Sequence, residues 1–215
     1  MKILAINGSP RKNKNTATLL QNALNGAAAQ GAETELIHLF DLDYKGCMSC
    51  FACKLKDGPS YGKCAYNDGL LPVLEKIQTV DALVLGSPMY FDSITGYMRA
   101  FLERLMFPIL TYTEGYKGLL EKKVPVGFIY TMNVTQDYMI EAGYLHGLQV
   151  VERYLQKLFG YSESMAAYDT YQFNDYSKYV ATAFDEKAKA KVKAEQFPID
   201  CKNAFELGAR LTQNI

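Results

Sequence analysis

Four consecutive apolar residues at 82–85 (ALVL) constrain the fold of this chain more than any other feature. They follow an amphipathic segment over 70–78 and end at Gly86-Ser87-Pro88. A strand with one wet face alternates apolar and polar residues, whereas an uninterrupted apolar run is typical of a strand covered on both faces. Strands of this kind belong to parallel sheets with helices on each side. The run therefore predicts a buried parallel strand.

Apolar runs and amphipathic segments alternate along the rest of the chain. Strands are expected at 2–7, 33–40, 82–85, 124–131 and 164–171, and helical spacing of apolar residues is found at 16–27, 70–78, 94–105, 148–158 and in two stretches after Val180 that Pro198 separates. The helix over 94–105 is expected to stop before Pro108, and Lys187, Lys189, Lys191 and Lys193 are interpreted as one solvated helix face. The pattern predicts an α/β fold, a doubly wound five-stranded parallel sheet in three α/β/α layers. One domain is expected over 1–215, with an irregular excursion at about 41–68.

Composition points to a small-molecule protein. The 23 basic and 23 acidic residues leave no net charge, so no overall positive field favours nucleic acid or anionic lipid. No apolar run approaches the roughly 20 residues of a membrane helix, and the chain enters an apolar strand at once without a signal-peptide layout. We therefore expect a cytoplasmic protein.

The loop after the first strand reads as a phosphate cradle. Residues 8–16 (GSPRKNKNT) offer hydroxyls, amides, a guanidinium and free backbone N–H groups at a helix amino terminus, which suits an anion. The loop matches neither G-x-x-x-x-G-K-[ST] nor G-x-G-x-x-G, which disfavours nucleotide hydrolysis and the usual dinucleotide fold. The alternative is an ordinary loop in which Asn15 or Thr16 caps the helix.

The loop after the buried strand, residues 86–96 (GSPMYFDSITG), carries two adjacent aromatic residues. Tyr90 and Phe91 can border a flat ring while backbone groups bind its heteroatoms, and Pro88 stiffens the chain. The alternative is that both aromatics belong to the core. Because the strands are parallel, this loop lies near the phosphate loop at the carboxyl edge of the sheet, the usual place for ligands.

Four of the five cysteines fall within eighteen residues. Cys47, Cys50 and Cys53 are spaced C-x2-C-x2-C, and Cys64 follows after ten residues. In a reducing compartment such bunching indicates metal or redox chemistry before structural disulfides. Cys201, in a predicted helical stretch, is expected to be a small packing residue.

These three segments together resemble the flavodoxin-like NAD(P)H-dependent FMN reductase and iron–sulfur flavoprotein family, and residues 169–179 resemble a segment near that family's end. The resemblance implies a flavodoxin-like fold and a bound FMN. It places the phosphate at Ser9, Arg11, Asn13, Asn15 and Thr16, and the isoalloxazine at Pro88, Met89, Tyr90, Phe91, Asp92 and Ser93, bordered by Thr131, Met132 and Asn133. The flavin would carry the redox chemistry, so no catalytic acid or base is proposed, and His38 and His146 are interpreted as structural.

Three readings of the cysteine loop stay open. With Cys64 as fourth ligand the loop could hold a [4Fe-4S] cluster, although the interval from Cys53 is longer than in the compact motif of cluster-bearing relatives. A turn at Gly58-Pro59 and Gly62 could fold Cys64 back. A four-cysteine zinc site and free thiols or reversible disulfides are the alternatives.

The principal hypothesis is an enzyme that passes hydride or electrons from NADH or NADPH through FMN to a quinone, flavin or other small acceptor. The second is an iron–sulfur flavoprotein that relays electrons from a ferredoxin-like partner. A third is a structural protein with zinc on the cysteines and adventitious anions at the loop. The resemblance also implies a homo-oligomer. No site for the ribose 2′-phosphate distinguishes the two nicotinamides.

Overall fold

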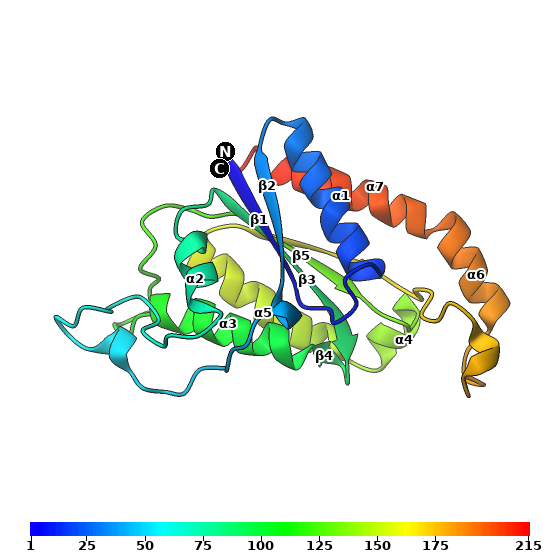
Figure 1. The fold of residues 1–215 in the computed structure, drawn as a ribbon, viewed down its shortest axis with the longest axis horizontal. Coiled ribbons are helices and arrows are strands. Elements are labelled where there is room, and N and C mark those ends of the chain that lie inside the picture. Colours follow the sequence, from blue (N-terminus) through cyan, green and yellow to red (C-terminus); the bar gives the residue numbers. More distant parts are fainter.

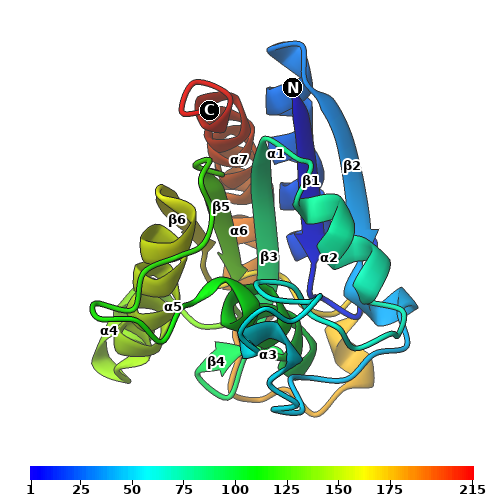
Figure 2. The same cartoon turned by 90° about the vertical axis from the view of Figure 1, so that its left-hand side faces the viewer.

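Five parallel strands form the centre of the computed structural model, which describes residues 1–215. Their order across the sheet is β2-β1-β3-β5-β6 (Figure 2). The strands are β1 (Lys2–Asn7), β2 (Glu33–His38), β3 (Ala82–Tyr90), β5 (Val126–Thr131) and β6 (Ser162–Ala167). A two-residue strand, β4 (Ser93–Ile94), pairs antiparallel with the end of β3. The predicted five-stranded parallel sheet is confirmed, and β4 makes a sixth strand that the sequence pattern did not indicate.

Helices cover both faces of this sheet (Figure 1). One face carries α1 (Asn15–Ala29) and α7 (Phe197–Leu211), and the other carries α2 (Leu71–Ile77), α3 (Gly96–Ile109) and α5 (Tyr144–Phe159). The remaining helices are α4 (Gln136–Glu141), α6 (Glu186–Glu195) and short 3-10 turns at Leu39–Asp41, Ala52–Lys54 and Tyr176–Lys178. The three-layer, doubly wound arrangement predicted from the sequence is confirmed. No helix is both long and apolar enough to cross a membrane.

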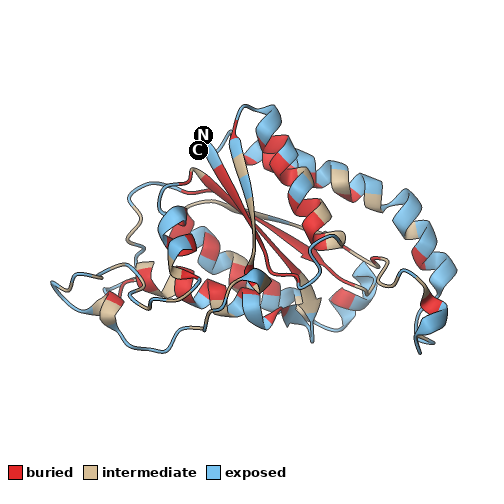
Figure 3. Cartoon of the chain, viewed as in Figure 1, coloured by how far each residue is buried: buried red, intermediate tan, exposed pale blue.

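The location of β3 between two helical layers explains its uninterrupted apolar sequence. Leu83 and Leu85 pack into the larger core, beneath α2, α3 and α5, while Ala82 and Val84 pack into the smaller core, beneath α1 and α7. All four side chains are fully buried, and the central strands in Figure 3 are coloured mostly as buried. Because each face of β3 meets its own helical layer, no position of the run is free for a polar residue.

Two glycines set the distance between α1 and α7. A Cβ on Gly208 would lie 1.8 Å from the Ala23 carbonyl oxygen, and one on Gly26 would lie 1.9 Å from that of Phe205. Both neighbours are backbone atoms, which cannot rotate away. The absence of side chains at these two positions therefore lets the helices touch backbone to backbone.

Helix α3 differs from its predicted end. It continues through Pro108 to Ile109 instead of stopping before the proline. Proline removes one backbone donor, and the end of the helix leaves the carbonyls of its last turn without intrahelical partners. The ammonium of Lys54 supplies hydrogen bonds to the carbonyls of Phe107, Pro108 and Leu110. This side chain from the cysteine segment satisfies the helix end and fastens the segment to α3.

Candidate functional site

A cleft opens at the carboxyl edge of the sheet, where the loops after β1, β3, β5 and β6 meet. Its lining residues are Ser9, Arg11, Lys14, Asn15, Thr16, Pro88, Met89, Tyr90, Thr131, Met132, Asn133, Thr170 and Gln172. The two loops chosen from the sequence therefore meet in one cavity.

The first turn of α1 supplies this cleft with unpaired backbone donors. The N–H groups of Asn15, Thr16 and Ala17 have no acceptor within the chain. The turn contains no acidic residue, and the N-cap residue Lys14 gives no side-chain cap. A helix amino terminus carries a partial positive charge, and Arg11 and Lys14 add two cations beside it. This end of the cleft fits a phosphate group.

Neither residue suggested as a conventional helix cap acts as one. The Asn15 amide donates to the Tyr171 carbonyl at 3.1 Å, and the Thr16 hydroxyl pairs with that of Thr131 at 2.8 Å. Both side chains instead connect the loop to the neighbouring strand ends. The backbone donors of the first turn stay free for a ligand.

Polar contacts across the sheet hold the phosphate loop in place. The Gly8 N–H donates to the Gly86 carbonyl at 2.8 Å, and the Thr95 hydroxyl donates to the Gly8 carbonyl, also at 2.8 Å. The Asn7 side chain accepts from the Ser9 N–H and pairs with the His38 ring at 2.9 Å. Burial lowers the pKa of His38, which favours the neutral ring. His38 thus has the structural role expected of it, as a partner of Asn7.

Fewer residues at the end of β3 line the cleft than the sequence predicted. Strand β3 extends to Tyr90, so Pro88, Met89 and Tyr90 line the cleft. Phe91 and Asp92 then take left-handed φ values of 48° and 63° in a tight turn into β4. The turn carries Phe91, Asp92 and Ser93 past the cleft, and the Phe91 side chain is fully exposed. Asn13, also expected at the site, is exposed and outside the lining.

Three lining residues were not singled out from the sequence: Lys14, Thr170 and Gln172. The guanidinium of Arg11 donates to the Gln172 carbonyl at 2.7 Å, and the Lys14 ammonium donates to the Asn174 side chain at 2.6 Å. The segment after β6 therefore lies against the phosphate loop. The sequence of this segment resembles the family's terminal segment, which pointed to the region but did not identify the individual lining residues.

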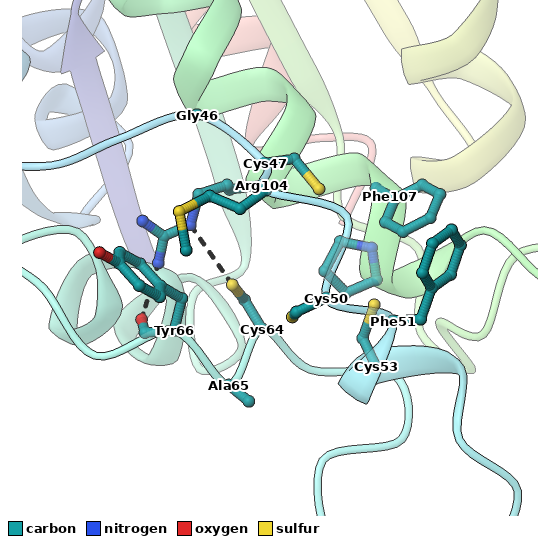
Figure 4. A pocket seen from close by; sticks show the side chains of 12 residues that line it. Gly46, Cys47, Cys50, Phe51, Cys53, Cys64, Ala65, Tyr66, Arg104 and Phe107 are labelled. Atoms are coloured by element: carbon teal, nitrogen blue, oxygen red, sulfur yellow. Dashed lines mark hydrogen bonds between the residues drawn. The ribbon is translucent and has the colours of Figure 1, made fainter.

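All four clustered cysteines line a second, small cavity (Figure 4). The long interval before Cys64 closes on itself because the Gly62 N–H donates to the Cys53 carbonyl at 3.0 Å. Gly62 has a left-handed φ of 76°, and Gly58 begins one of the turns within the interval. The chain is thereby folded back, and Cys64 faces the same space as the C-x2-C-x2-C residues.

Arg104 of α3 is the buried anchor of this cysteine segment. Its Nε donates to the Cys64 sulfur at 3.3 Å, as Figure 4 shows, and its other nitrogens donate to the carbonyls of Lys45 and Tyr66 and to the Asp68 carboxylate. Burial opposes the charge of Asp68, but hydrogen bonds from Arg104 and from backbone N–H groups outweigh burial and lower its pKa. Only 1% of the Arg104 side chain is exposed, so the pair is held away from water.

The cysteine cavity is not a ready-made site for one metal ion. No three His, Cys, Asp or Glu side chains converge on a common point for a single ion. Burial raises the pKa of Cys53, which favours its neutral thiol. Arg104, Phe107 and Pro108 in the C-terminal half of α3 line the cysteine cavity, whereas no residue of α3 lines the cleft. Cys201 lies apart on α7 and packs against the smaller core, as expected.

Comparison with known proteins gives concordant results. The sequence model of the NADPH-dependent FMN reductase family matches residues 1–174. An iron–sulfur flavoprotein of Archaeoglobus fulgidus is 44% identical over 104 residues, 48% of each chain. The chain spans about half the length of the curated relatives it matches first.

Two solved structures share the fold at low sequence identity. An NAD(P)H:quinone oxidoreductase from Methanothermobacter marburgensis superposes with a TM-score of 0.73 at 12% identity, covering 98% of both chains. A flavodoxin from the domain Archaea superposes with a TM-score of 0.50 at 12% identity, covering 100% of this chain and 98% of its own. The fold is flavodoxin-like, as predicted.

Proposed function

The chain belongs to the NADPH-dependent FMN reductase family, and on that premise we propose that it is an FMN-binding, NAD(P)H-dependent oxidoreductase. It would pass hydride or electrons from the nicotinamide through FMN to a small acceptor such as a quinone or a flavin. The observation that supports this most directly is the first turn of α1, whose unpaired N–H groups and two flanking cations open into a cleft bordered by Pro88–Tyr90.

The polarity of the cleft matches the two ends of FMN. Ser9, Arg11, Asn15 and Thr16, with Lys14, would hold the phosphate through charge-assisted and backbone hydrogen bonds. The isoalloxazine would lie against Pro88–Tyr90 and 131–133. FMN supplies a ring that accepts hydride when bound. The lining contains no Asp, Glu, His or Cys, so the protein would bind and orient the reactants without a carboxylate or imidazole.

Anaerobic reduction of the reconstituted protein tests this function. Protein loaded with FMN is mixed with NADPH or NADH, and loss of the oxidised-flavin absorption is followed. We expect at least one nicotinamide to reduce the flavin and a quinone to restore its absorption. Failure to bind FMN, or failure of both nicotinamides to reduce it, would overturn the proposal.

A second candidate function, an iron–sulfur flavoprotein electron carrier, is supported by the cysteine cavity. Four thiols line one space, and the Gly62–Cys53 hydrogen bond folds the long interval before Cys64 back on itself. Each ligand of a [4Fe-4S] cluster binds a different iron, so cluster ligands lie farther apart than the ligands of one ion. A ferredoxin-like protein would then be the electron donor, and a homo-oligomer is expected on the family resemblance.

Iron and sulfide analysis after anaerobic reconstitution separates the two candidates. The carrier requires both elements in the wild-type protein and their loss in Cys64→Ser, with Cys201→Ser as the matched control. Absence of iron and sulfide from the wild type would exclude the carrier and leave the reductase.

A further inference from the structure

Helix α6 buries one of its four lysines. Residues Lys187, Lys191 and Lys193 are exposed, but Lys189 is only 2% exposed. An α-helix turns by about 100° per residue, so residues two apart point to nearly opposite sides. Lysines at every second position therefore cannot share one solvated face, which corrects the interpretation made from the sequence. The position of Lys189 on α6 therefore directs its side chain toward the protein interior.

The Lys189 ammonium joins two loops that border the cleft. It donates to the Asn133 carbonyl at 2.8 Å and to the Asp169 carboxylate at 2.5 Å. Asn133 follows β5 and lines the cleft, while Asp169 follows β6 immediately before the lining residue Thr170. One buried cation thus connects the two strand ends that form one wall.

The same two loops are already paired through their backbones. The Thr170 N–H and hydroxyl both donate to the Met132 carbonyl at 3.0 Å, and the Asp169 N–H donates to the Val134 carbonyl at 2.8 Å. Asp169 has a left-handed φ of 49°, a conformation that Asp adopts more readily than most non-glycine residues. Lys189 supplies a hydrogen bond to the side chain of this turn residue.

The wall also contains a polar atom without a partner. The Asn133 side-chain oxygen is buried and accepts no hydrogen bond within the chain. The backbone carbonyl of Asn133 is therefore held by Lys189, while its buried side-chain oxygen has no partner in the chain.

We propose that Lys189 is a positioning residue for the flavin site: it holds the loops at 131–134 and 167–170 in the arrangement that FMN requires. This inference rests on the proposed function and assigns part of the site to α6, which lies beyond the 1–174 match to the family. Because linkage is reciprocal, FMN should in turn stabilise the docking of α6.

The matched pair Lys189→Met and Lys191→Met tests the proposal. Both variants remove one lysine from α6, but the Lys191 side chain is 72% exposed and makes only a 3.8 Å contact with Glu195. We expect FMN affinity to fall at least about tenfold in Lys189→Met, the equivalent of 1.4 kcal/mol, and to stay near wild type in Lys191→Met. The flavin midpoint potential is measured alongside, because altered positioning changes it whereas a general loss of stability does not.

A purely structural role gives a different result. In that case the melting temperature of the FMN-free protein falls while FMN affinity and flavin potential stay unchanged, and the proposal is overturned. If Lys189→Met does not fold, Asp169→Asn serves instead, with the same expected loss of affinity. If FMN slows hydrogen exchange in α6 of the wild type, the coupling is supported, whereas unchanged exchange contradicts it. If the wild type binds no FMN, the proposed function itself is refuted. If the wild type and Lys189→Met bind FMN with equal affinity, only this inference is refuted.

Discussion

Replacing Arg104 with methionine should release the cysteine segment from α3. The substitution leaves the Asp68 carboxylate and the carbonyls of Lys45 and Tyr66 without their buried donor. Removing one partner of a buried ion pair costs about 3–5 kcal/mol. The N–H groups of Lys45 and Leu70 still donate to Asp68 at 3.2 and 3.0 Å, so we expect a loss near the lower limit, about 3 kcal/mol.

Urea unfolding at pH 7 measures this loss, with Arg99→Met as the control. Arg99 lies on the same helix, but its side chain is 58% exposed and its contact with Glu103 is 3.7 Å long. Exposed pairs contribute about 0–1 kcal/mol, so the control should unfold almost as the wild type does. Limited proteolysis should cut Arg104→Met faster within 46–64. Equal stabilities for the two variants would refute the anchoring role of Arg104.

The difference between these variants should depend on pH. The folded pKa of Asp68 is lowered, because the hydrogen bonds from Arg104 and the backbone outweigh the opposing effect of burial. The resulting stabilisation is present above the unfolded pKa of about 3.9 and is lost as pH falls through the lower folded value. The stability gap between wild type and Arg104→Met should therefore narrow in strong acid. A gap that is constant from pH 7 to strong acid would contradict this assignment.

Three further predictions concern other parts of the molecule. Gly208→Ala should cost about 1–3 kcal/mol by overpacking, because its Cβ would meet the Ala23 backbone, whereas Gly147→Ala on α5, with its nearest atom 3.8 Å away, should be neutral or stabilising in thermal unfolding. Asp200→Asn should stabilise the protein at pH 7 by about 1 kcal/mol, because burial raises the pKa of Asp200 and its Oδ2 has no partner. Since the raised folded pKa makes the wild type lose stability as pH rises, the gain should vanish below about pH 3.9; a gain independent of pH would count against buried charge as its cause. Arg11→Gln should weaken FMN binding and reduce its dependence on salt, measured by flavin fluorescence from low to high ionic strength; an unchanged salt dependence would remove Arg11 from the phosphate site.

The sheet and the location of the cleft could be predicted because both follow from local patterns. The apolar run at 82–85 requires two helical layers, and parallel strands bring residues 8–16 and 86–96 to one edge. The geometry of the turn after β3 was harder to predict, because the residue types at 91–93 do not indicate that a hairpin carries them past the cleft. The end of α3 at Pro108 accepts hydrogen bonds from Lys54, which is more than fifty residues away in the sequence.

Lys189 shows a signal that the sequence contained. Its helical phase relative to Lys187 and Lys191 places it on another face, although its partners Asn133 and Asp169 could be identified only from the folded chain. The closure of the Cys53–Cys64 interval likewise depends on one backbone hydrogen bond from Gly62. Contacts between distant segments, and not local propensity, decide these features.

Comparative titration of the FMN-free protein with FMN and riboflavin tests the central claim most directly, because the two ligands differ only in the phosphate. If the first turn of α1 with Arg11 and Lys14 forms the phosphate site, FMN binds with one-to-one stoichiometry and at least about a hundredfold more tightly than riboflavin, a difference of about 2.7 kcal/mol. Equal affinities for FMN and riboflavin, or no binding of either, would contradict the account.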